Sequence, residues 1–501
     1  MVTIKLQQNA NLPGKNQVGK ISNWIILVPE SISDSEIKKI PYGQILNQRK
    51  KQLKKKFSSK SYFSLDLPNE KICHLLFACA GISISRYELL GFAAKLLKEN
   101  NTCKGTDLGI LVHGFDKEVA EKMAEALIAA AFASEAEMPA FKSSKNKQQI
   151  KLKKLYLYGL KTSHGFKRTI AEAEGNELAR RLSILPSNKL TPTEYLKEAR
   201  SLAKANNWKL EFYDLKELKK KKAGAFVAVA QGSPVADAGI IRLRYTPQKK
   251  ISGKNSLSLV GKGICYDTGG TNLKPANYMF GMHEDMQGSA VALGTFLALT
   301  RLKVNFPVEC WLSLAMNHIG PKAYKPNDVV TASDGTTIEV VHTDAEGRMI
   351  LSDTLVLVSR LKPSLIIDYA TLTGACIYSL GKAYSGIFTN KEELNPVLID
   401  AGKDSGERVW PFPMDEDYDK MLESDIADIK QCSRESGSDH ILASRFLQRF
   451  VKNDVPWIHI DLSSSNRKGG LAHIPTDTTG FGVRFTLNLL LDKKILGHNL
   501  K

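Results

Sequence analysis

The first third of the chain contains several short apolar runs separated by polar segments. Up to about residue 165 they are typical of buried strands, and one alanine-rich stretch with apolar residues at helical spacing, Val119–Ala133, predicts a helix. The predicted strands are Trp24–Val28, His74–Ala78, Leu108–His113 and Leu155–Gly159. His74 and His113 lie within these strands, and we interpret them as packed core histidines rather than ligands. This part is therefore predicted to be a small α/β domain.

After about residue 186 strands alternate with helices, and a helix at Thr169–Leu182 is predicted to connect the two parts. The predicted strands are Lys209–Tyr213, Ala225–Ala230, Ile240–Tyr245, Leu257–Ile264, Val308–Ala315, Ile338–His342, Ser364–Ala370 and Trp457–Asp461. The predicted helices are Gly288–Leu302, Arg348–Leu361, a segment after Gly374, and His440–Val451. Such alternation is typical of a largely parallel sheet covered by helices on both faces.

The predicted fold class is therefore α/β, with two domains of unequal size. A small N-terminal α/β domain covers residues 1–165, a connecting helix covers 166–185, and a larger C-terminal domain covers 186–501. The sheet of the larger domain is predicted to be mostly parallel or mixed and to lie between helices.

Composition agrees with two soluble domains. A chain of 501 residues exceeds one ordinary core, and its 43% hydrophobic and 24% charged residues are typical of soluble globular proteins. No apolar run approaches the roughly 20 residues that span a bilayer, and Met1–Asn23 lacks the apolar core of a signal peptide. The seven cysteines show no CxxC spacing, which is typical of free thiols in a reducing compartment. We expect a cytoplasmic protein without membrane contact.

The net charge of +18 leaves two interpretations open. Much of it lies in three basic runs, Arg49–Lys60, Lys142–Lys154 and Lys219–Lys222. Such runs could bind DNA or another acidic partner through an electrostatic patch. They could equally be solvated lysines on ordinary surface. We favour the second interpretation, because lysine greatly outnumbers arginine in the runs and few aromatic residues are interleaved with them.

Acidic and polar residues follow several predicted strands of the larger domain. Asp267 comes after one strand, and Asp344 with Glu346 comes after a second. Thr371 follows a third. Because loops at the carboxyl ends of parallel strands converge on one crevice, we expect these side chains to lie on the same rim.

Each acid by itself has an ordinary explanation, either as a helix cap or as a turn residue. Four acids near strand ends, with the Gly269-Gly270 turn between two of them, favour a divalent metal site instead. Oxygen ligands suit Mg²⁺, Mn²⁺ or Zn²⁺, and the lack of Cys or His in the set disfavours a structural zinc site. The four acids are Asp267, Asp285, Asp344 and Glu346.

Three basic residues accompany the acids, and metal chemistry has a use for each type. A lysine amine ligates a metal when it is neutral, and an adjacent dication lowers its pKa. A charged lysine can stabilise an oxyanion, and an arginine can hold a planar anion. Two metals about 3.5–4 Å apart could activate a bridging water and polarise a carbonyl. The three residues are Lys262, Lys274 and Arg348, so we interpret the set as a two-metal hydrolytic centre.

At these residues the chain resembles the leucine aminopeptidase (cytosol aminopeptidase) family of two-metal peptidases. Thr343–Arg348 is similar to the signature of that family, and other motifs match in order and spacing. These are Val260–Ile264, Asp267–Gly270, Leu273–Pro275, Asp285-Met286, Asp368–Gly374 and Thr479-Gly480. The resemblance is strong over roughly 165–490 and weak in the N-terminal domain. It implies an intracellular metalloaminopeptidase, a hydrolase that releases N-terminal amino acids from peptides.

The resemblance also implies a role for each residue. Lys262, Asp267, Asp285 and Glu346 would hold the tighter metal, and Asp267, Asp344 and Glu346 the more exchangeable one, with Mn²⁺ or Zn²⁺ as the ions. Lys274 would polarise the substrate carbonyl. Arg348 would hold a bicarbonate that acts as general base. The first side-chain pocket, with a preference for Leu or Met, would be lined by Met282, Thr371, Leu372 and Gly374.

The family resemblance further implies a homohexamer, and a DNA-binding accessory role is the alternative function. Three departures from the family pattern lie near the site. His342 stands where Asn is usual, and Asn272 where Ser is usual. Ser436–His440 replaces a glycine-rich segment. We expect His342 to titrate near neutrality.

Overall fold

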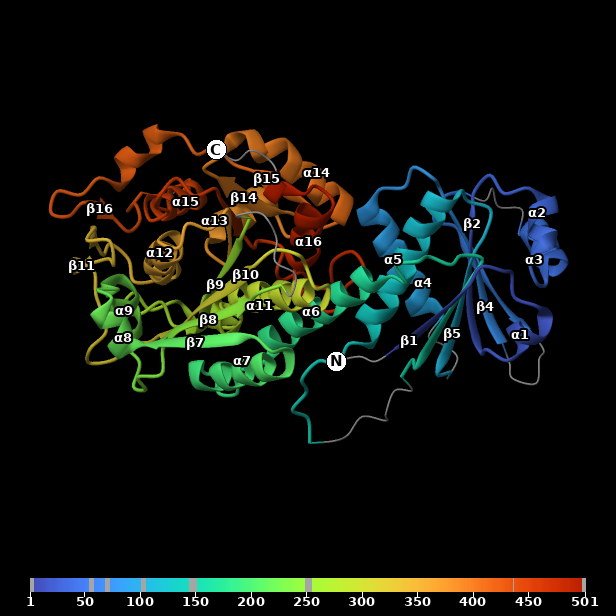
Figure 1. The fold of residues 1–501 in the computed structure, drawn as a ribbon, viewed down its shortest axis with the longest axis horizontal. Coiled ribbons are helices and arrows are strands. Elements are labelled where there is room, and N and C mark those ends of the chain that lie inside the picture. The colour runs from blue at the N-terminus through green and yellow to red at the C-terminus, as the bar shows by residue number, and fades with distance from the viewer. Residues whose placement is uncertain are drawn as a thin grey trace. The chain divides into compact units, whose positions relative to one another are not determined.

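The structure is a computed structural model that describes residues 4–53, 58–67, 73–100, 105–143, 151–247, 255–435 and 437–497. It divides into two compact units (Figure 1). The first consists of Met1–Ala173 with Gly469–Asp477, and the second of Glu174–Lys468 with Thr478–Lys501. The sequence pattern did not predict that residues 469–477 belong to the first unit. Within the described ranges, no helix is both long and apolar enough to cross a membrane.

The first unit is built on a six-stranded sheet in the order β1-β6-β5-β2-β4-β3, parallel except for β3. Its strands are β1 Lys5–Asn9, β2 Asn23–Pro29, β3 Tyr62–Leu67, β4 Cys73–Ala80, β5 Asp107–Val112 and β6 Lys154–Tyr158. Its helices are α1 Lys15–Gly19, α2 Asp34–Lys39, α3 Gly43–Gln52, α4 Arg86–Asn100 and α5 Lys117–Glu135. The four predicted strands and the predicted helix are confirmed. Sequence reasoning missed the edge strands β1 and β3.

Strand β2 shows why the predicted strands of this unit are continuously apolar. All seven of its residues are buried. Ile25 and Leu27 face the core shared with α4 and α5, whereas Trp24 and Ile26 face the core shared with α2 and α3. Because both faces of the sheet are covered, alternate residues have no solvent side to point to.

The second unit is built on an eight-stranded mixed sheet in the order β15-β14-β17-β13-β9-β10-β8-β7. Its four middle strands, β17, β13, β9 and β10, are parallel to one another. The strands are β7 Lys209–Asp214, β8 Gly239–Tyr245, β9 Leu257–Asp267, β10 Val308–Asn317, β13 Leu365–Ala370, β14 Ser385–Thr389, β15 Val409–Pro411 and β17 Trp457–Asp461. A separate three-stranded sheet consists of β11 Val329–Thr331, β12 Thr337–Glu339 and β16 Ile429–Lys430.

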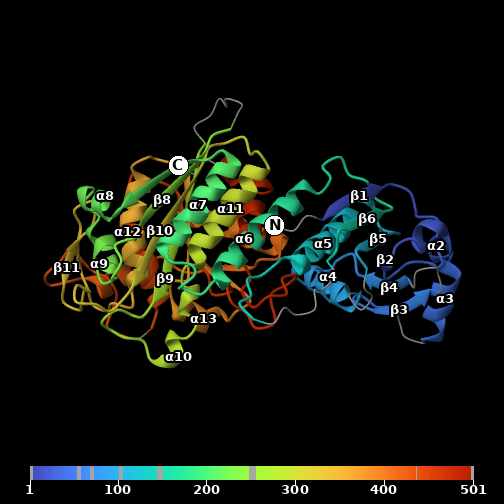
Figure 2. The ribbon, with the colours of Figure 1, turned by 90° about the horizontal axis from the view of Figure 1, so that it is seen from below.

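Helices cover this sheet on both sides, as the sequence predicted. The α-helices are α6 Lys167–Ile184, α7 Pro192–Asn206, α8 Leu215–Lys220, α9 Gly224–Ala230, α10 Ala276–Met279, α11 Gln287–Arg301, α12 Glu346–Ser359, α13 Gly374–Leu380, α14 Asn395–Ser405, α15 Asp439–Arg449 and α16 Val483–Leu491. Short 3₁₀ turns are η1 Met282–Glu284, η2 Glu392–Leu394, η3 Glu416–Leu422 and η4 Ile495–Gly497. In Figure 2, α7 and α11 lie on the near side of the sheet and α12 lies beyond it. The predicted α/β class is confirmed.

Successive side chains of the central strand β9 point to opposite faces of the sheet, and this alternation positions Lys262. A Cβ on Gly261 would lie 2.4 Å from the Cα of Ser289 in α11, so only glycine permits this close approach of helix to strand. The next residue, Lys262, points to the opposite face, where its side chain lies against Gly347 at the start of α12. The pleat of the strand therefore directs Lys262 toward α12 and away from α11.

Two predicted strands are wrong. Ala225–Ala230 is the helix α9, packed on α12, because a run of six small and apolar residues has no period that separates a strand from a buried helix. Ile338–His342 is shortened to β12, which belongs to the small sheet. Beyond β12 the side-chain oxygen of Gln431 accepts the backbone N–H groups of Val341 and His342, which ends the strand pairing there.

Candidate functional site

A cleft of about 1250 Å³ lies in the second unit at the carboxyl ends of β9 and β13. All the candidate residues line it: Lys262, Asp267, Lys274, Met282, Asp285, Asp344, Glu346, Arg348, Thr371, Leu372 and Gly374. They come from four segments: β9 with its following loop, η1 with Asp285, the start of α12 with the loop before it, and the loop from β13 to the start of α13. The tertiary fold thus brings residues more than one hundred positions apart into one cavity.

Lys262 is buried in the floor of this cleft, with only 3% of its surface exposed. Its Nζ lies 2.9 Å from Oδ1 of Asp285 and 2.9 Å from Oε1 of Glu346. It also donates to the backbone carbonyl of Thr371 at 2.9 Å. The Oγ1 of Thr371 in turn donates to Oδ1 of Asp285 at 2.7 Å, so Thr371 orients both members of the pair.

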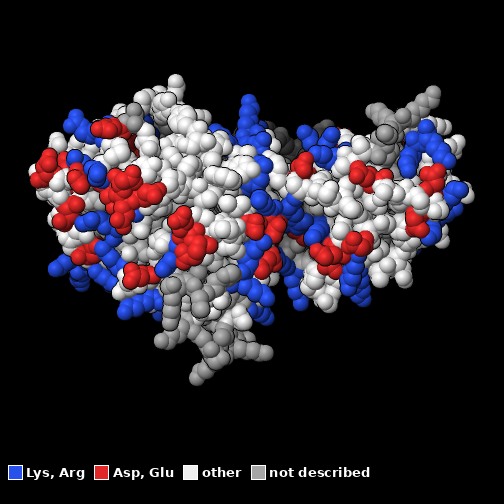
Figure 3. Space-filling view, turned by 90° about the horizontal axis from the view of Figure 1, so that it is seen from above, with Lys and Arg blue, Asp and Glu red and all other residues white. Residues whose placement is uncertain are grey.

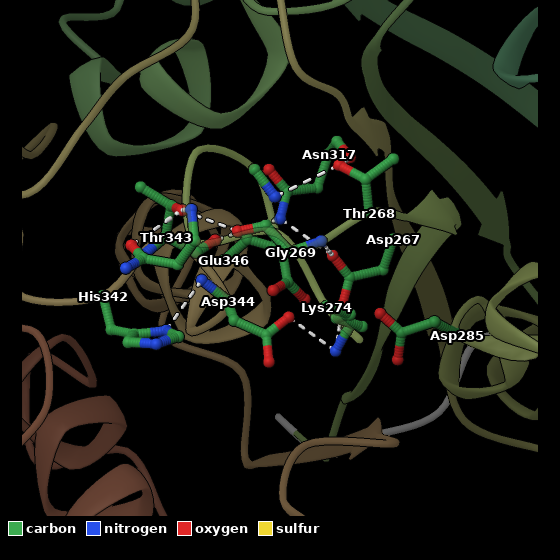
Figure 4. A network of polar contacts seen from close by, with 12 residues as sticks. Asp267, Thr268, Gly269, Lys274, Asp285, Asn317, His342, Thr343, Asp344 and Glu346 are labelled. Atoms are coloured by element: carbon green, nitrogen blue, oxygen red, sulfur yellow. Dashed lines mark hydrogen bonds and ion pairs between the residues drawn. The ribbon is translucent and has the colours of Figure 1, made fainter. Parts of the chain in front are cut away.

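Lys274 links the other two acids. Its Nζ lies 2.9 Å from Oδ2 of Asp267 and 2.5 Å from Oδ1 of Asp344. Figure 4 shows Lys274 beside both acids. Carboxylate oxygens of Asp267, Asp344 and Glu346 all lie within 4.8 Å of one another. Three carboxylates so close together repel one another unless cations lie between them.

The electrostatics of the cleft reflect this crowding. Burial, followed by the Asp267 and Glu346 carboxylates, raises the pKa of Asp344 to about 7. Burial also raises the pKa of Glu346 and, far more, that of Asp285. Burial lowers the pKa of Lys262, but the surrounding carboxylates outweigh burial and hold its pKa above the usual value.

Two buried carboxylate oxygens show that these residues fit a metal. Oδ2 of Asp285 and Oε2 of Glu346 have no hydrogen-bond partner. A buried acceptor without a partner costs free energy, and a divalent cation is the ligand that such oxygens prefer. The amine of Lys262 could join them only by losing a proton, which a neighbouring dication favours.

The loop before α12 is tied to the loop after β9. Gly269 and Gly270 have φ values of +86° and +67°, which only glycine adopts without strain, and a Cβ on Gly270 would lie 2.8 Å from Oγ1 of Thr343. Thr343 Oγ1 donates to the Gly269 carbonyl at 2.6 Å. Asn272 completes the tie, because its Oδ1 accepts the Thr343 N–H at 2.9 Å. The Gly-Gly turn thus brings Asp267 and Asp344 together.

Residues that sequence reasoning missed stabilise the same loop. The side-chain amide of Asn317 donates to Oδ1 of Asp267 and to the Thr343 carbonyl, at 2.8 and 3.0 Å. The buried hydroxyl of Tyr324 donates to the same carbonyl at 2.7 Å. Little in the sequence pointed to Asn317, because it lies two residues beyond the predicted strand Val308–Ala315. Only the structure shows that it is paired with Asp267 across β10 and β9.

The prediction that the polar residues follow neighbouring strands of one sheet is correct for only some of them. Asp267 and Thr371 follow strands of the large sheet, but Asp344 follows no strand of that sheet. It lies on the loop between β12 and α12, and Glu346 is the first residue of α12. The reasoning from strand ends was therefore wrong for this pair, although the side chains do meet.

His342 lies at the start of the loop that carries Asp344. Burial, followed by the charge of Lys274, lowers the pKa of its imidazole. Its Nδ1 accepts the backbone N–H of Asp344 at 3.3 Å, which requires an unprotonated Nδ1. The lowered pKa and this hydrogen bond both favour the neutral imidazole, which caps the loop.

Arg348 is 2% exposed, and two residues that the sequence did not indicate fix its guanidinium. Nη2 donates to Oδ1 of Asp439 at 2.8 Å, and Nη1 donates to the Gln431 carbonyl at 3.2 Å. Gln431 also donates from its side chain to the Ala345 carbonyl. The segment that includes Asp439 departs from the family pattern, so no motif pointed to it.

The wall near α13 is shaped by Asp461, at the end of β17. Its Oδ1 accepts the Leu372 N–H at 3.1 Å, and its Oδ2 accepts the Thr373 hydroxyl at 2.7 Å. These bonds fix the loop that carries Thr371, Leu372 and Gly374 into the cleft. Met282 faces the same cleft from η1.

Comparison with known proteins shows which family this chain resembles. The description "Cytosol aminopeptidase family, catalytic domain" matches residues 177–487, which is more than half of the chain. The chain belongs to the cytosol aminopeptidase family. The predicted resemblance is thereby confirmed, and the matched span includes every candidate residue.

Several relatives in the cytosol aminopeptidase family carry the name "Probable cytosol aminopeptidase". The protein of Polaromonas naphthalenivorans is 41% identical over 327 residues, or 65% of this chain and 62% of the relative. That of Wolbachia pipientis is 40% identical over 332 residues, or 66% and 65%. That of Albidiferax ferrireducens is 38% identical over 355 residues, or 70% and 72%. The first two matches thus span less than two thirds of the relatives' length.

A solved structure extends the likeness over nearly the whole chain. The bottromycin maturation enzyme BotP, determined in complex with Mn, superposes with a TM-score of 0.80 at 26% identity. The match covers 94% of this chain and 99% of that one. The N-terminal unit, outside the family match, therefore also has a counterpart in BotP.

Proposed function

We propose that the protein is a metal-dependent aminopeptidase that removes N-terminal residues from peptides with two divalent ions. The single observation that carries this proposal is the set of four acids with Lys262 in one cleft, including two buried oxygens that lack a partner. Membership in the cytosol aminopeptidase family supports it. The proposed location is the cytoplasm, in accord with the relatives' names.

The proposed ligand sets follow the observed contacts. Lys262, Asp267, Asp285 and Glu346 would hold one ion. Asp267, Asp344 and Glu346, whose oxygens lie within 4.8 Å, would hold the other. Bound there, the ions would supply an activated water and polarise the scissile carbonyl. Because BotP is described in complex with Mn, Mn²⁺ is the first ion to test, followed by Zn²⁺.

The chain's own side chains have the remaining tasks. Lys274 carries the charge that would stabilise the oxyanion as water adds to the peptide carbonyl. Thr371 and Asp461 hold the wall against which the first side chain would rest. Met282 and Leu372 make part of that wall apolar, which favours Leu or Met at the N-terminal position of the substrate.

The test is release of p-nitroaniline from leucine p-nitroanilide by purified protein that has been stripped of metal. Mn²⁺, Zn²⁺ or Mg²⁺ is then added back to the wild type and to Asp344→Ala. The matched control is Asp417→Ala, which removes an exposed acid outside the cleft. We expect metal-dependent turnover in the wild type and the control, and its loss in Asp344→Ala. No turnover on this substrate or on a panel of dipeptides with any metal would contradict the proposal.

The alternative of DNA binding has no support from the comparisons. Lys219–Lys222 is exposed at the end of α8, while the other two basic runs lie partly outside the described residues. On the face drawn in Figure 3, basic and acidic side chains are interspersed over much of the surface. Such a mixture attracts a polyanion less than a patch of one sign. A homohexamer remains part of the proposal, and light scattering would test it.

A further inference from the structure

Arg348 already has an anionic partner within the chain. Its guanidinium is buried, and Nη2 lies 2.8 Å from Oδ1 of Asp439. Asp439 is the first residue of α15, and its side chain is 43% exposed, so the carboxylate lies between the buried arginine and the open cleft. Both residues line the cavity that contains the four acids.

Two of the three guanidinium nitrogens of Arg348 already have acceptors within the chain, and only the buried Nε has none among the described residues. Nη1 donates to the Gln431 carbonyl, and Nη2 is engaged by Asp439. The charge of Arg348 is matched by the Asp439 carboxylate, and Glu346 lies two residues before Arg348 at the start of α12. A diffusible anion would have to displace Asp439 or bind beside it among like charges, and both cost free energy.

A tethered carboxylate provides the same chemistry as a small planar anion. Carboxylate and carbonate both present two oxygens to the donors of a guanidinium. The residue in the chain is held near its target by the fold, whereas a free ion loses translational freedom whenever it binds. Replacing a monovalent anion by Asp439 also leaves the net charge of the site unchanged.

We infer that Asp439 takes the anion position on Arg348 that bicarbonate was expected to occupy, and that it serves as the proton acceptor for the attacking water. The inference rests on the proposed aminopeptidase function. In the step, water transfers a proton to the Asp439 carboxylate as its oxygen bonds to the scissile carbonyl carbon. The C–N bond then breaks, and the same proton passes to the leaving amine.

An ordinary role for Asp439 is also available, and it predicts a different outcome. An acid in the first turn of a helix stabilises the helix dipole, here that of α15. In that case, removal of the carboxylate would lower stability slightly and would create no requirement for an external anion. Rescue by bicarbonate therefore separates the two roles.

The experiment compares the metal-loaded wild type with Asp439→Ala and Asp439→Asn in buffer freed of carbon dioxide, with and without sodium bicarbonate. Wild-type turnover of leucine p-nitroanilide is expected to change less than about twofold when bicarbonate is added. Asp439→Ala is expected to lose on the order of 10²-fold in kcat, typical of a lost general base, and to regain most of it with bicarbonate. Asp439→Asn should stay inactive, because its amide fills the space without accepting a proton.

A binding measurement gives a readout besides activity. Equilibrium dialysis with [¹⁴C]bicarbonate is expected to show retention by Asp439→Ala, and none by the wild type or by the double variant with Arg348→Ala. A wild type that binds bicarbonate at Arg348 or needs it for turnover would overturn the inference, as would an Asp439→Ala variant that is fully active without it. An inactive wild type would instead count against the proposed function, and the dialysis would then decide the inference alone.

Discussion

Each unit has a central buried strand, but the two strands carry different kinds of side chain. In the first unit β2 is apolar over its whole length apart from Asn23, and all seven of its residues are buried. In the second unit β9 is buried apart from the partly exposed Tyr266, yet it carries Lys262 in its middle and ends at Asp267. Burying a charge costs several kcal/mol even when it is paired, so the second strand gives up stability that the first retains. The difference agrees with a candidate site in the second sheet rather than in the first.

The largest expected effect concerns the buried lysine. Lys262→Met should destabilise the metal-free second unit by about 3–5 kcal/mol, because it leaves the Asp285 and Glu346 carboxylates buried without their cation. The matched change in the first unit is Leu27→Met in β2, which should cost less than about 1.5 kcal/mol. Hydrogen exchange followed by mass spectrometry reports the two units separately. Equal losses in both would remove the distinction between the strands.

Metal loading should act on one unit only. At a free metal concentration 100-fold above its Kd, a bound ion stabilises the protein by about 2.7 kcal/mol. We expect slower exchange in β9 and β13 when Mn²⁺ is added, and no change in β2 or β5. Protection that is spread over both sheets, or that persists in Asp344→Ala, would show that the ions bind elsewhere.

The smallest expected loss of stability comes from disturbing the close packing of β9 against α11. Gly261→Ala places a Cβ 2.4 Å from the Cα of Ser289, which should cost about 1–3 kcal/mol and reduce turnover by shifting Lys262. Gly14→Ala is the control, because its Cβ would meet only the end of the Gln17 side chain at 3.9 Å. Thermal unfolding and kcat measure the two consequences. An unchanged Tm for Gly261→Ala would mean that α11 can move away from the strand.

Local pattern predicted most of the fold but failed in identifiable places. Most of the predicted apolar strands and helices are present, because their patterns lie within short segments, whereas the helices α4, α14 and α16 were not predicted. Ala225–Ala230 was wrong, since a short apolar run suits a buried helix as well as a strand. The edge strands β1 and β3 were missed, because partly exposed strands carry fewer apolar residues.

The sequence by itself determined the identity of the acids and basic residues of the site, because their types and spacing follow a family motif that lies within short segments. Only the tertiary structure decided how these segments meet. The pairing of Arg348 with Asp439 joins positions 91 apart, and Asn317 reaches Asp267 across 50 residues. Such contacts depend on which strand lies beside which and on how a loop closes, and neither is a property of any local stretch of the chain.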